Sequence, residues 1–199
     1  MCKKLVVING KGKSGKDTFV GCCAYMSNWF VYNFTSIALV KKSAEILGWK
    51  GDKNIEDRKF LSDLKQLSIN YNNQPNEYLV YCAEKMPDNS LGFFHIRESK
   101  EIDVFKSSLN TEVQTVIIER FDKEFNYGNL SDDEVDVYKY DYKVYNKGII
   151  EELMTESKKF LDWLQVPYNE DRYIQMCNSG NWNVRSSFVS DGCCNIQGK

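Results

Sequence analysis

The stretch that decides the fold is KKLVVINGKGKSGKDT, residues 3–18. Its continuous apolar run, residues 5–8, is rich in β-branched side chains, which is typical of a strand buried on both faces. The run leads into the fixed positions of the G-x-x-x-x-G-K phosphate-loop pattern, which are Gly10, Gly15 and Lys16. Apolar residues at helical spacing follow over residues 16–31. We therefore expect a central parallel strand, a phosphate loop and a helix in immediate succession.

The residue types of this loop suit a bound phosphate group. Glycine lets successive backbone N–H groups turn toward an anion, and the following helix offers its free N–H groups and the positive end of its dipole. Lys16 supplies a full charge to the β- and γ-phosphates. The residues expected to bind ATP here are Gly10, Lys11, Gly12, Lys13, Ser14, Gly15, Lys16, Asp17 and Thr18. The alternative is a turn rich in glycine and lysine that binds nothing, which the flanking strand and helix disfavour.

The loop departs from the common motif at one position. Asp17 stands where serine or threonine usually offers a hydroxyl group to Mg²⁺, and Thr18 comes one residue later. A carboxylate can hold the metal directly or through water, with Thr18 on an α-phosphate. We expect a magnesium site at Asp17 and Thr18.

Length and composition indicate one medium-sized α/β domain. The chain has 199 residues, of which 42% are hydrophobic and 14% aromatic, with a net charge of −2. This charge balance calls for neither a nucleic-acid polymer nor an anionic membrane as a partner. We find no apolar run of membrane-spanning length and no signal-peptide pattern, so we expect a cytoplasmic protein that acts on a small molecule; a homodimer is left open.

The seven cysteines form no C-x-x-C pair, which favours reduced and mostly buried thiols. A metal site would have to use the three cysteines nearest the C-terminus. Those are Cys177, Cys193 and Cys194. Their spacing fits no standard zinc site, and the chain has only one histidine, so we do not expect one.

Hydrophobic patterning places the other elements. Further strands are expected at residues 35–40, 91–96, 113–118 and 142–145, and further helices at 41–48, 52–67, 75–86, 100–109 and 149–164. The helix at 52–67 should be amphipathic, with most of its charged residues on a solvated face and its apolar side chains together on the other face. Those are Ile55, Phe60, Leu61, Leu64 and Leu67. The alternation predicts a three-layer α/β fold with a mostly parallel five-stranded sheet and right-handed crossovers.

Charged residues follow the predicted strands, where ligands bind in an open parallel sheet. Arg97 follows the third strand and can face a phosphate, or it can pair with Glu101 one helical turn later. Arg120 follows the fourth strand. Arg58 is a candidate to bind the phosphate of a second substrate, because a guanidinium group can donate two parallel hydrogen bonds to phosphate oxygens. His95 is more typical of a satisfied core histidine than of a catalytic one.

Two segments lack apolar periodicity. Residues 121–136 suit a lid over a phosphate site or a polar surface loop, with Arg120 and Lys123 placed to reach transferring phosphates. Beyond a kinase-like domain at 1–166, residues 167–199 carry no motif. We expect them to form a loosely structured appendage that packs against the core.

Over residues 3–164 the chain resembles the P-loop nucleoside monophosphate kinases, most of all the phage-type deoxynucleoside monophosphate kinases. The most specific piece is SGKDT at residues 14–18, an ending that some phosphomevalonate kinases share. The segment DRKFLSDLK at 57–65 resembles the substrate-side helices of the group, and HIRESKE at 95–101 resembles its DVR-x-x-x-E. The segment DYKVYNKGIIEEL at 141–153 resembles its terminal strand, turn and helix.

The resemblance implies roles for particular residues. Arg58 and Arg97 would bind the acceptor phosphate, Arg120 would complete the phosphate cage, and Asn146 and Gly148 would lie beside the purine of ATP. The segment at 121–136 is similar to the lid of the group only in its position and in Ser131 and Asp132.

The chain departs from the group at His95, where the group carries aspartate, so Asp17 or Glu98 would have to compensate at the metal.

The resemblance implies ATP- and Mg²⁺-dependent phosphorylation of a small phosphate-bearing acceptor, in the first place a (deoxy)nucleoside monophosphate. Three alternatives stay open: a kinase of another metabolite phosphate such as phosphomevalonate, a nucleotide-binding protein without transferase activity, and a protein-interaction module. A transferase consumes ATP only when its acceptor is present, and a nucleotide-binding protein binds ATP without turnover. An interaction module keeps its function in Lys16→Ala.

Overall fold

The computed structural model describes residues 3–52, 54–120, 135, 137–179 and 189–190. Its centre is one sheet in the order β5-β4-β1-β3-β2-β6, in which all paired strands are parallel. The strands are β1 (Lys4–Asn9), β2 (Phe30–Thr35), β3 (Ser90–His95), β4 (Val113–Arg120), β5 (Tyr142–Asn146) and β6 (Val189–Ser190). The sheet thus has five main strands, which is the expected number, and a further strand of two residues.

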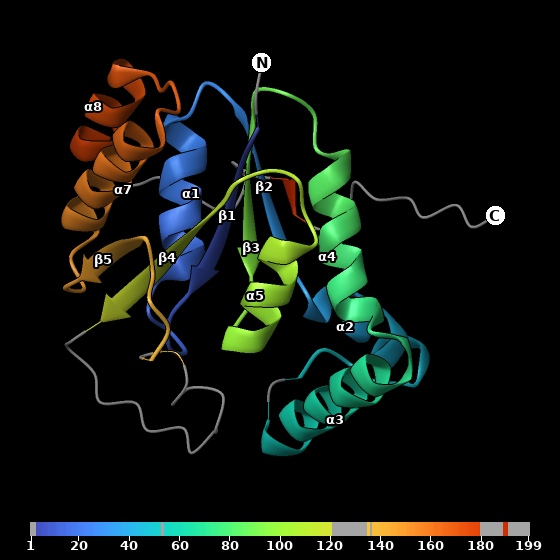
Figure 1. The fold of residues 1–199 in the computed structure, drawn as a ribbon. Coiled ribbons are helices and arrows are strands. Elements are labelled where there is room, and N and C mark those ends of the chain that lie inside the picture. Colours follow the sequence, from blue (N-terminus) through green and yellow to red (C-terminus); the bar gives the residue numbers. More distant parts are fainter. Residues whose placement is uncertain (1–2, 53, 121–134, 136, 180–188, 191–199) are drawn as a thin grey trace.

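Helices cover both faces of the sheet (Figure 1). The helices of the described residues are α1 (Lys16–Met26), α2 (Ile37–Ile46), α3 (Ile55–Asn72), α4 (Gln74–Lys85), α5 (Ser99–Ser107), α7 (Ile150–Leu164) and α8 (Glu170–Ser179). Helices α1, α7 and α8 lie on one face, and α4 and α5 lie on the other. This arrangement confirms the predicted three-layer α/β fold.

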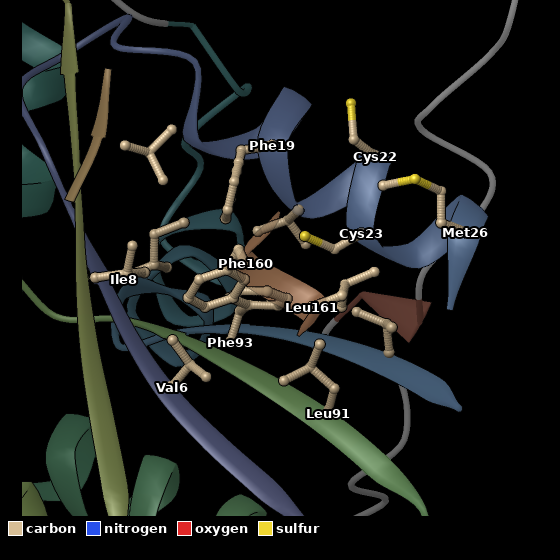
Figure 2. Close-up of a cluster of buried hydrophobic side chains, with 14 of the residues drawn as sticks. Val6, Ile8, Phe19, Cys22, Cys23, Met26, Leu91, Phe93, Phe160 and Leu161 are labelled. Carbon is tan, nitrogen blue, oxygen red and sulfur yellow. The ribbon is translucent and has the colours of Figure 1, made fainter. Parts of the chain in front are cut away.

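Strand β1 is buried on both faces, as its apolar run predicted. Val6 and Ile8 belong to the hydrophobic cluster beneath α1 and α7, where Phe19 and Phe160 pack edge to face at 5.3 Å (Figure 2). Leu5 and Val7 belong to the opposite cluster, beneath α4 and α5. The four side chains are at most 1% exposed. Burying each stabilises the fold by roughly 1.5–3 kcal/mol, so β1 is anchored in the middle of the molecule.

The second strand was predicted in the wrong place. Residues 35–40 were expected to be extended, but the strand is β2, and residues from Ile37 onward form α2. Short apolar runs suit a strand or a buried helix equally well. In the fold, Ile37, Val40 and Ala44 recur at helical spacing and pack in a small cluster with α3. The first helix correspondingly ends at Met26, not near residue 31.

Helix α3 is the amphipathic helix predicted at 52–67, but its apolar face is only partly buried. Leu61 is buried in this helix, whereas Ile55 is 86% exposed and Leu67 is 66% exposed. The helix packs against α2 and α4 and projects beyond the carboxyl ends of the strands instead of lying flat on the sheet (Figure 1). A helix that projects in this way has too few neighbours to cover a whole apolar stripe.

Part of the C-terminal region is ordered against the core. Residues expected to be loosely structured form α8, which packs beside α1 and α7. Lys158 of α7 bonds to Glu170 at 2.5 Å and lies 4.6 Å from the ring centre of Tyr173. Strand β6 then pairs with β2 at the edge of the sheet. The C-terminal region therefore touches the domain at two separated places.

The segment predicted as a lid falls mostly outside the described residues, and Lys123, Ser131 and Asp132 lie there. Across the described ranges, the structure contains no helix that is both long enough and apolar enough to cross a membrane. Cys22, Cys23 and Cys82 are free and buried, and Cys177 is free and exposed. Three of these four thiols are therefore buried, as predicted.

Candidate functional site

The site is built where β1 ends and α1 begins. The intervening loop contains three residues in the left-handed region of backbone conformation: Gly10 (φ +142°), Lys13 (φ +60°) and Gly15 (φ +97°). A Cβ atom on Gly10 would lie 2.4 Å from the carbonyl oxygen of Ile118, and one on Gly15 would lie 2.4 Å from Nδ2 of Asn146. Both glycines are thus required by space as well as by conformation. The loop has the compact form expected of a phosphate loop in a P-loop fold.

The side chain of Lys16 folds back over this loop. Its Nζ donates hydrogen bonds to the carbonyl oxygens of Gly10 at 2.6 Å and Lys11 at 2.8 Å, and lies 3.4 Å from Oγ of Ser14. The backbone N–H of Ser14 donates to Lys11, which closes the loop. These bonds hold the positive charge of Lys16 against the loop.

Asn146 supports the loop from the neighbouring β5. Its Nδ2 donates to the carbonyl oxygen of Ser14 at 2.8 Å, and its Oδ1 accepts from the N–H of Gly148 at 2.9 Å. The residue is 5% exposed. The bond to Ser14 shows that Asn146 fixes the loop backbone. Whether Asn146 and Gly148 adjoin a purine stays a prediction.

The strand order places the loop at a switch point of the sheet. After β1 the chain first builds β2 and β3 on one side of β1 and then β4 and β5 on the other, which is where open parallel sheets bind ligands. Arg120 ends β4 directly beside Asn146 in register, and it is half-buried. Arg97 follows β3 and is exposed. The fold therefore brings Lys16, Arg97 and Arg120 to one edge.

Arg58 lies in the first turn of α3 and is exposed. Its helix lies at the same end of the sheet as the phosphate loop (Figure 1). The helix begins with a side-chain cap, because Oδ1 of Asn54 accepts a hydrogen bond from the N–H of Asp57 at 2.8 Å. Arg58 is thus carried by a capped helix end, and its role as a phosphate ligand stays a prediction.

Helix α3 is tied to the body of the protein by an ion pair that the sequence did not reveal. Nζ of Lys65 bonds to both carboxylate oxygens of Glu101 on α5, at 3.0 and 3.1 Å. The carboxylate is 8% exposed and the lysine side chain 19%. Sequence reasoning offered Arg97 as the partner of Glu101; the fold provides Lys65, which lies 36 residues from Glu101 along the chain.

His95 ends β3 close to the phosphate loop. Its Nε2 lies 2.7 Å from Oδ1 of Asn33 on β2 and 4.0 Å from Oδ1 of Asp17 on α1. Burial lowers the pKa of His95 to about 4, assisted by Lys16 and Arg97, although the carboxylate of Asp17 opposes the shift. The imidazole is therefore neutral near pH 7, and its Nε2 carries the proton donated to Asn33. The residue is a satisfied strand histidine that also faces the site.

The predicted magnesium ligands differ in their surroundings. The side chain of Asp17 is 87% exposed, Thr18 is half-buried, and Glu98 is the half-buried residue that precedes α5. Within the part of the chain that the structure describes, no three His, Cys, Asp or Glu side chains gather into a metal site. Mg²⁺ generally binds through one or two carboxylates, waters and substrate phosphates, and Asp17 and Thr18 beside the loop fit that pattern.

Sequence reasoning missed Asn9, whose side chain is 1% exposed at the end of β1. Its Oδ1 accepts from the N–H of Gly10 at 2.8 Å, and its Nδ2 donates to the carbonyl oxygen of Arg97 and to the hydroxyl group of Tyr140. A polar residue directly after a fully buried apolar run was the signal that could have identified it.

Comparisons with known proteins give no close sequence relative. The chain matches no protein-family model, and no curated protein matches it. Among solved structures, the unliganded crystal structure of a sugar kinase from Janibacter sp. HTCC2649 is similar at 15% sequence identity and a TM-score of 0.46. The similarity covers 83% of this chain and 96% of that chain. The function proposed below therefore rests on the geometry of the loop and of the strand ends.

Proposed function

We propose that this protein is an ATP-dependent phosphotransferase whose acceptor is a (deoxy)nucleoside monophosphate. The observation that carries the proposal is the loop between β1 and α1, in which Gly10 and Gly15 adopt conformations open to glycine and Nζ of Lys16 lies 2.6 Å from a loop carbonyl oxygen. Such a loop at the switch point of a parallel sheet suits the phosphates of ATP.

The proposed mechanism depends on position and charge, because phosphoryl transfer needs little covalent chemistry from the protein. The loop backbone and Lys16 bind the donor phosphates. Arg97 and Arg58 orient the phosphate of the acceptor. Arg120, which is in register with Asn146, adds positive charge near the phosphoryl group that is transferred. Asn146 holds the backbone of the loop. Together these residues would align the two substrates and stabilise the charge that develops between them.

The residues that would hold Mg²⁺ are Asp17 and Thr18, with Glu98 as a further carboxylate. When bound, the metal neutralises charge on the phosphate oxygens. Asp17 is exposed enough to reach a metal directly or through water. His95, the last residue of β3, lies beside Asp17 as a neutral imidazole, so β3 itself adds no carboxylate to the metal site.

A nucleotide-binding protein without transferase activity is the second candidate, and the specific observation in its favour is His95. An imidazole brings no negative charge to the place where the resembled kinases carry aspartate. Because the pKa of His95 is lowered to about 4, the side chain is neutral there near pH 7. Such a protein would bind ATP through the same loop without turnover.

The deciding experiment measures ATP consumption with Mg²⁺ against the four common deoxynucleoside monophosphates, their ribose counterparts and phosphomevalonate. Lys16→Ala is the loss-of-function control, and Lys85→Ala, on the exposed end of α4, is the matched surface control. We expect turnover with a nucleoside monophosphate that is lost in Lys16→Ala and kept in Lys85→Ala. Turnover with phosphomevalonate would name a different acceptor, and ATP binding without turnover would support the second candidate.

A further inference from the structure

The side chain of Asn9 uses its hydrogen-bonding groups on three different parts of the site. Its Oδ1 accepts from the N–H of Gly10 at 2.8 Å. Its Nδ2 donates to the carbonyl oxygen of Arg97 at 2.9 Å and to the hydroxyl group of Tyr140 at 2.8 Å. With 1% exposure, Asn9 has little access to water that could replace these partners. The three bonds therefore depend on this one amide group.

The three partners come from segments far apart in the sequence. Gly10 opens the phosphate loop, and Arg97 follows β3, 88 residues from Asn9. Tyr140 precedes β5 and is 8% exposed. The ring of Tyr140 packs edge to face on Tyr138 at 5.2 Å, and the hydroxyl group of Tyr138 donates to Asp103 of α5. Asn9 thus joins the loop to the segment that follows β3 and to the segment that precedes β5.

We propose that Asn9 is a positioning residue that couples the phosphate loop to the backbone of Arg97, so that the donor and acceptor sites keep a fixed relative geometry. The inference rests on the proposed function, in which the loop binds the donor and Arg97 binds the acceptor. Asn9 itself touches neither substrate. It acts through the orientation of the peptide groups at Gly10 and Arg97.

The amide group is matched to this task. It offers an acceptor oxygen and a nitrogen with two donor hydrogens, and the three observed bonds use one acceptor and both donors. Aspartate has the same shape but no donor when ionised, so it would repel the carbonyl oxygen of Arg97. Serine is shorter and offers a single donor. The coupling is therefore specific to asparagine and not a general property of a polar side chain here.

The first test needs neither substrate nor turnover. Amide hydrogen exchange is measured on the full-length protein and on Asn9→Ala, followed over the residue ranges 10–15, 96–99 and 137–141. We expect Asn9→Ala to raise exchange about ten-fold or more in all three ranges, because each loses a buried bond to the same side chain. Faster exchange confined to 10–15 would overturn the coupling.

The matched control is Asn146→Ala. Asn146 is also a buried asparagine that bonds the loop, but its hydrogen bonds within the described residues go to Ser14 and Gly148 and not to Arg97 or Tyr140. We expect it to raise exchange at 10–15 and to leave 96–99 unchanged. Tyr140→Phe removes a single hydroxyl group and is the mild variant if Asn9→Ala fails to fold. It should raise exchange at 137–141 and, to a smaller degree, at 96–99.

The second test separates positioning from stability through kinetics. Asn9→Ala should raise KM for the acceptor about ten-fold, the size expected when one buried hydrogen bond is lost. In an Arg97→Ala background the same change should add less than about two-fold, because the guanidinium group that the backbone at residue 97 carries toward the acceptor is already absent. Asn146→Ala should combine additively with Arg97→Ala. Additivity for Asn9 as well would contradict the inference.

The two tests separate failure of this inference from failure of the proposed function. If the unmodified protein turns over no acceptor, the proposed function is wrong, yet the exchange pattern still decides whether Asn9 couples the three segments. If turnover is found but Asn9→Ala changes ATP affinity alone, the function stands and the coupling is wrong.

Discussion

The side-chain amide of Asn146 lies where a Cβ atom of Gly15 would have to be. Its Nδ2 donates to the carbonyl oxygen of Ser14 at 2.8 Å, and an ideal Cβ on Gly15 would lie 2.4 Å from that same nitrogen. The end of β5 and the phosphate loop are therefore packed without room for even one methyl group.

Gly15→Ala is predicted to abolish measurable ATP binding, because the new methyl group clashes with Asn146 and the backbone has φ +97°. Gly48→Ala is the matched control, since Gly48 has φ +96° but open space around its Cβ position. It should cost about 1–2 kcal/mol of stability from backbone strain alone and leave ATP binding unchanged. Titration calorimetry and thermal unfolding check both variants, and equal effects on ATP binding would contradict the clash.

Lys16→Met is predicted to weaken ATP binding at least about ten-fold, the size expected when a charge-assisted hydrogen bond is lost. It should not lower the stability of the ligand-free protein by more than about 1 kcal/mol, because the bonds from Nζ to Gly10 and Lys11 lie on the partly solvated loop. The measurements are ATP titration and chemical unfolding. Unchanged ATP affinity would be incompatible with the proposed role of Lys16.

Removing one partner of the pair between Lys65 and Glu101 is predicted to be costly. Lys65→Met leaves a carboxylate that is 8% exposed without its cation, which should destabilise the protein by about 3 kcal/mol. The double variant Lys65→Met with Glu101→Leu should be more stable than Lys65→Met alone. Chemical unfolding measures all three proteins.

The control for this ion pair lies on the same helix. Lys59 and Asp63 pair at 2.6 Å, but their side chains are 76% and 64% exposed. Lys59→Met should therefore change stability by no more than about 0.5 kcal/mol. Equal losses of stability in Lys59→Met and Lys65→Met would show that burial of the pair between Lys65 and Glu101 has no energetic consequence.

His95→Asp is predicted to make thermal stability depend more strongly on Mg²⁺ and ATP. The new carboxylate would face Asp17, now 4.0 Å from the imidazole, as well as Oδ1 of Asn33, so the ligand-free variant should unfold at a lower temperature. A cation between the two carboxylates would offset that repulsion. The test compares the melting-temperature shift on adding Mg²⁺ and ATP in His95→Asp, His95→Asn and the unmodified protein, and equal shifts would count against a metal at Asp17.

Thiol reactivity should divide the described cysteines into two groups. Burial raises the pKa of Cys22 to about 12 and that of Cys23 well above its usual value, so neither forms thiolate near pH 8. Cys177 is exposed. Alkylation at pH 8 read by mass spectrometry should modify Cys177 within minutes and spare Cys22 and Cys23 until the protein unfolds.

These raised pKa values also affect stability at high pH. A group whose pKa is higher in the folded state stabilises the fold fully below its unfolded value, which is 9.0 here, and loses that contribution as pH rises toward the folded value. The free energy of unfolding should therefore fall between about pH 9 and 12. Cys22→Ala should reduce the slope, and an unchanged slope would argue against a buried neutral thiol.

The elements with strong local signals could be predicted from the order of the residues alone. The apolar run of β1, the glycine spacing of the loop and the position of Lys16 fix a strand, a phosphate loop and a helix, because the backbone there admits few alternatives. The long amphipathic helix α7 was likewise found within one residue of its start. Arg97 and Arg120 could be placed at one edge, since the carboxyl ends of parallel strands meet there.

The position of the second strand, the exposed surface of α3 and the residues that support the loop depend on contacts between distant parts of the chain. Residues 37–40 are apolar enough for a strand or a helix, and packing against α3 selects the helix. The bonds of Asn9 to Arg97 and of Lys65 to Glu101 join residues 88 and 36 positions apart. Local propensity cannot specify such pairs, because each forms only after the strands and helices have been brought together by burial of their apolar faces.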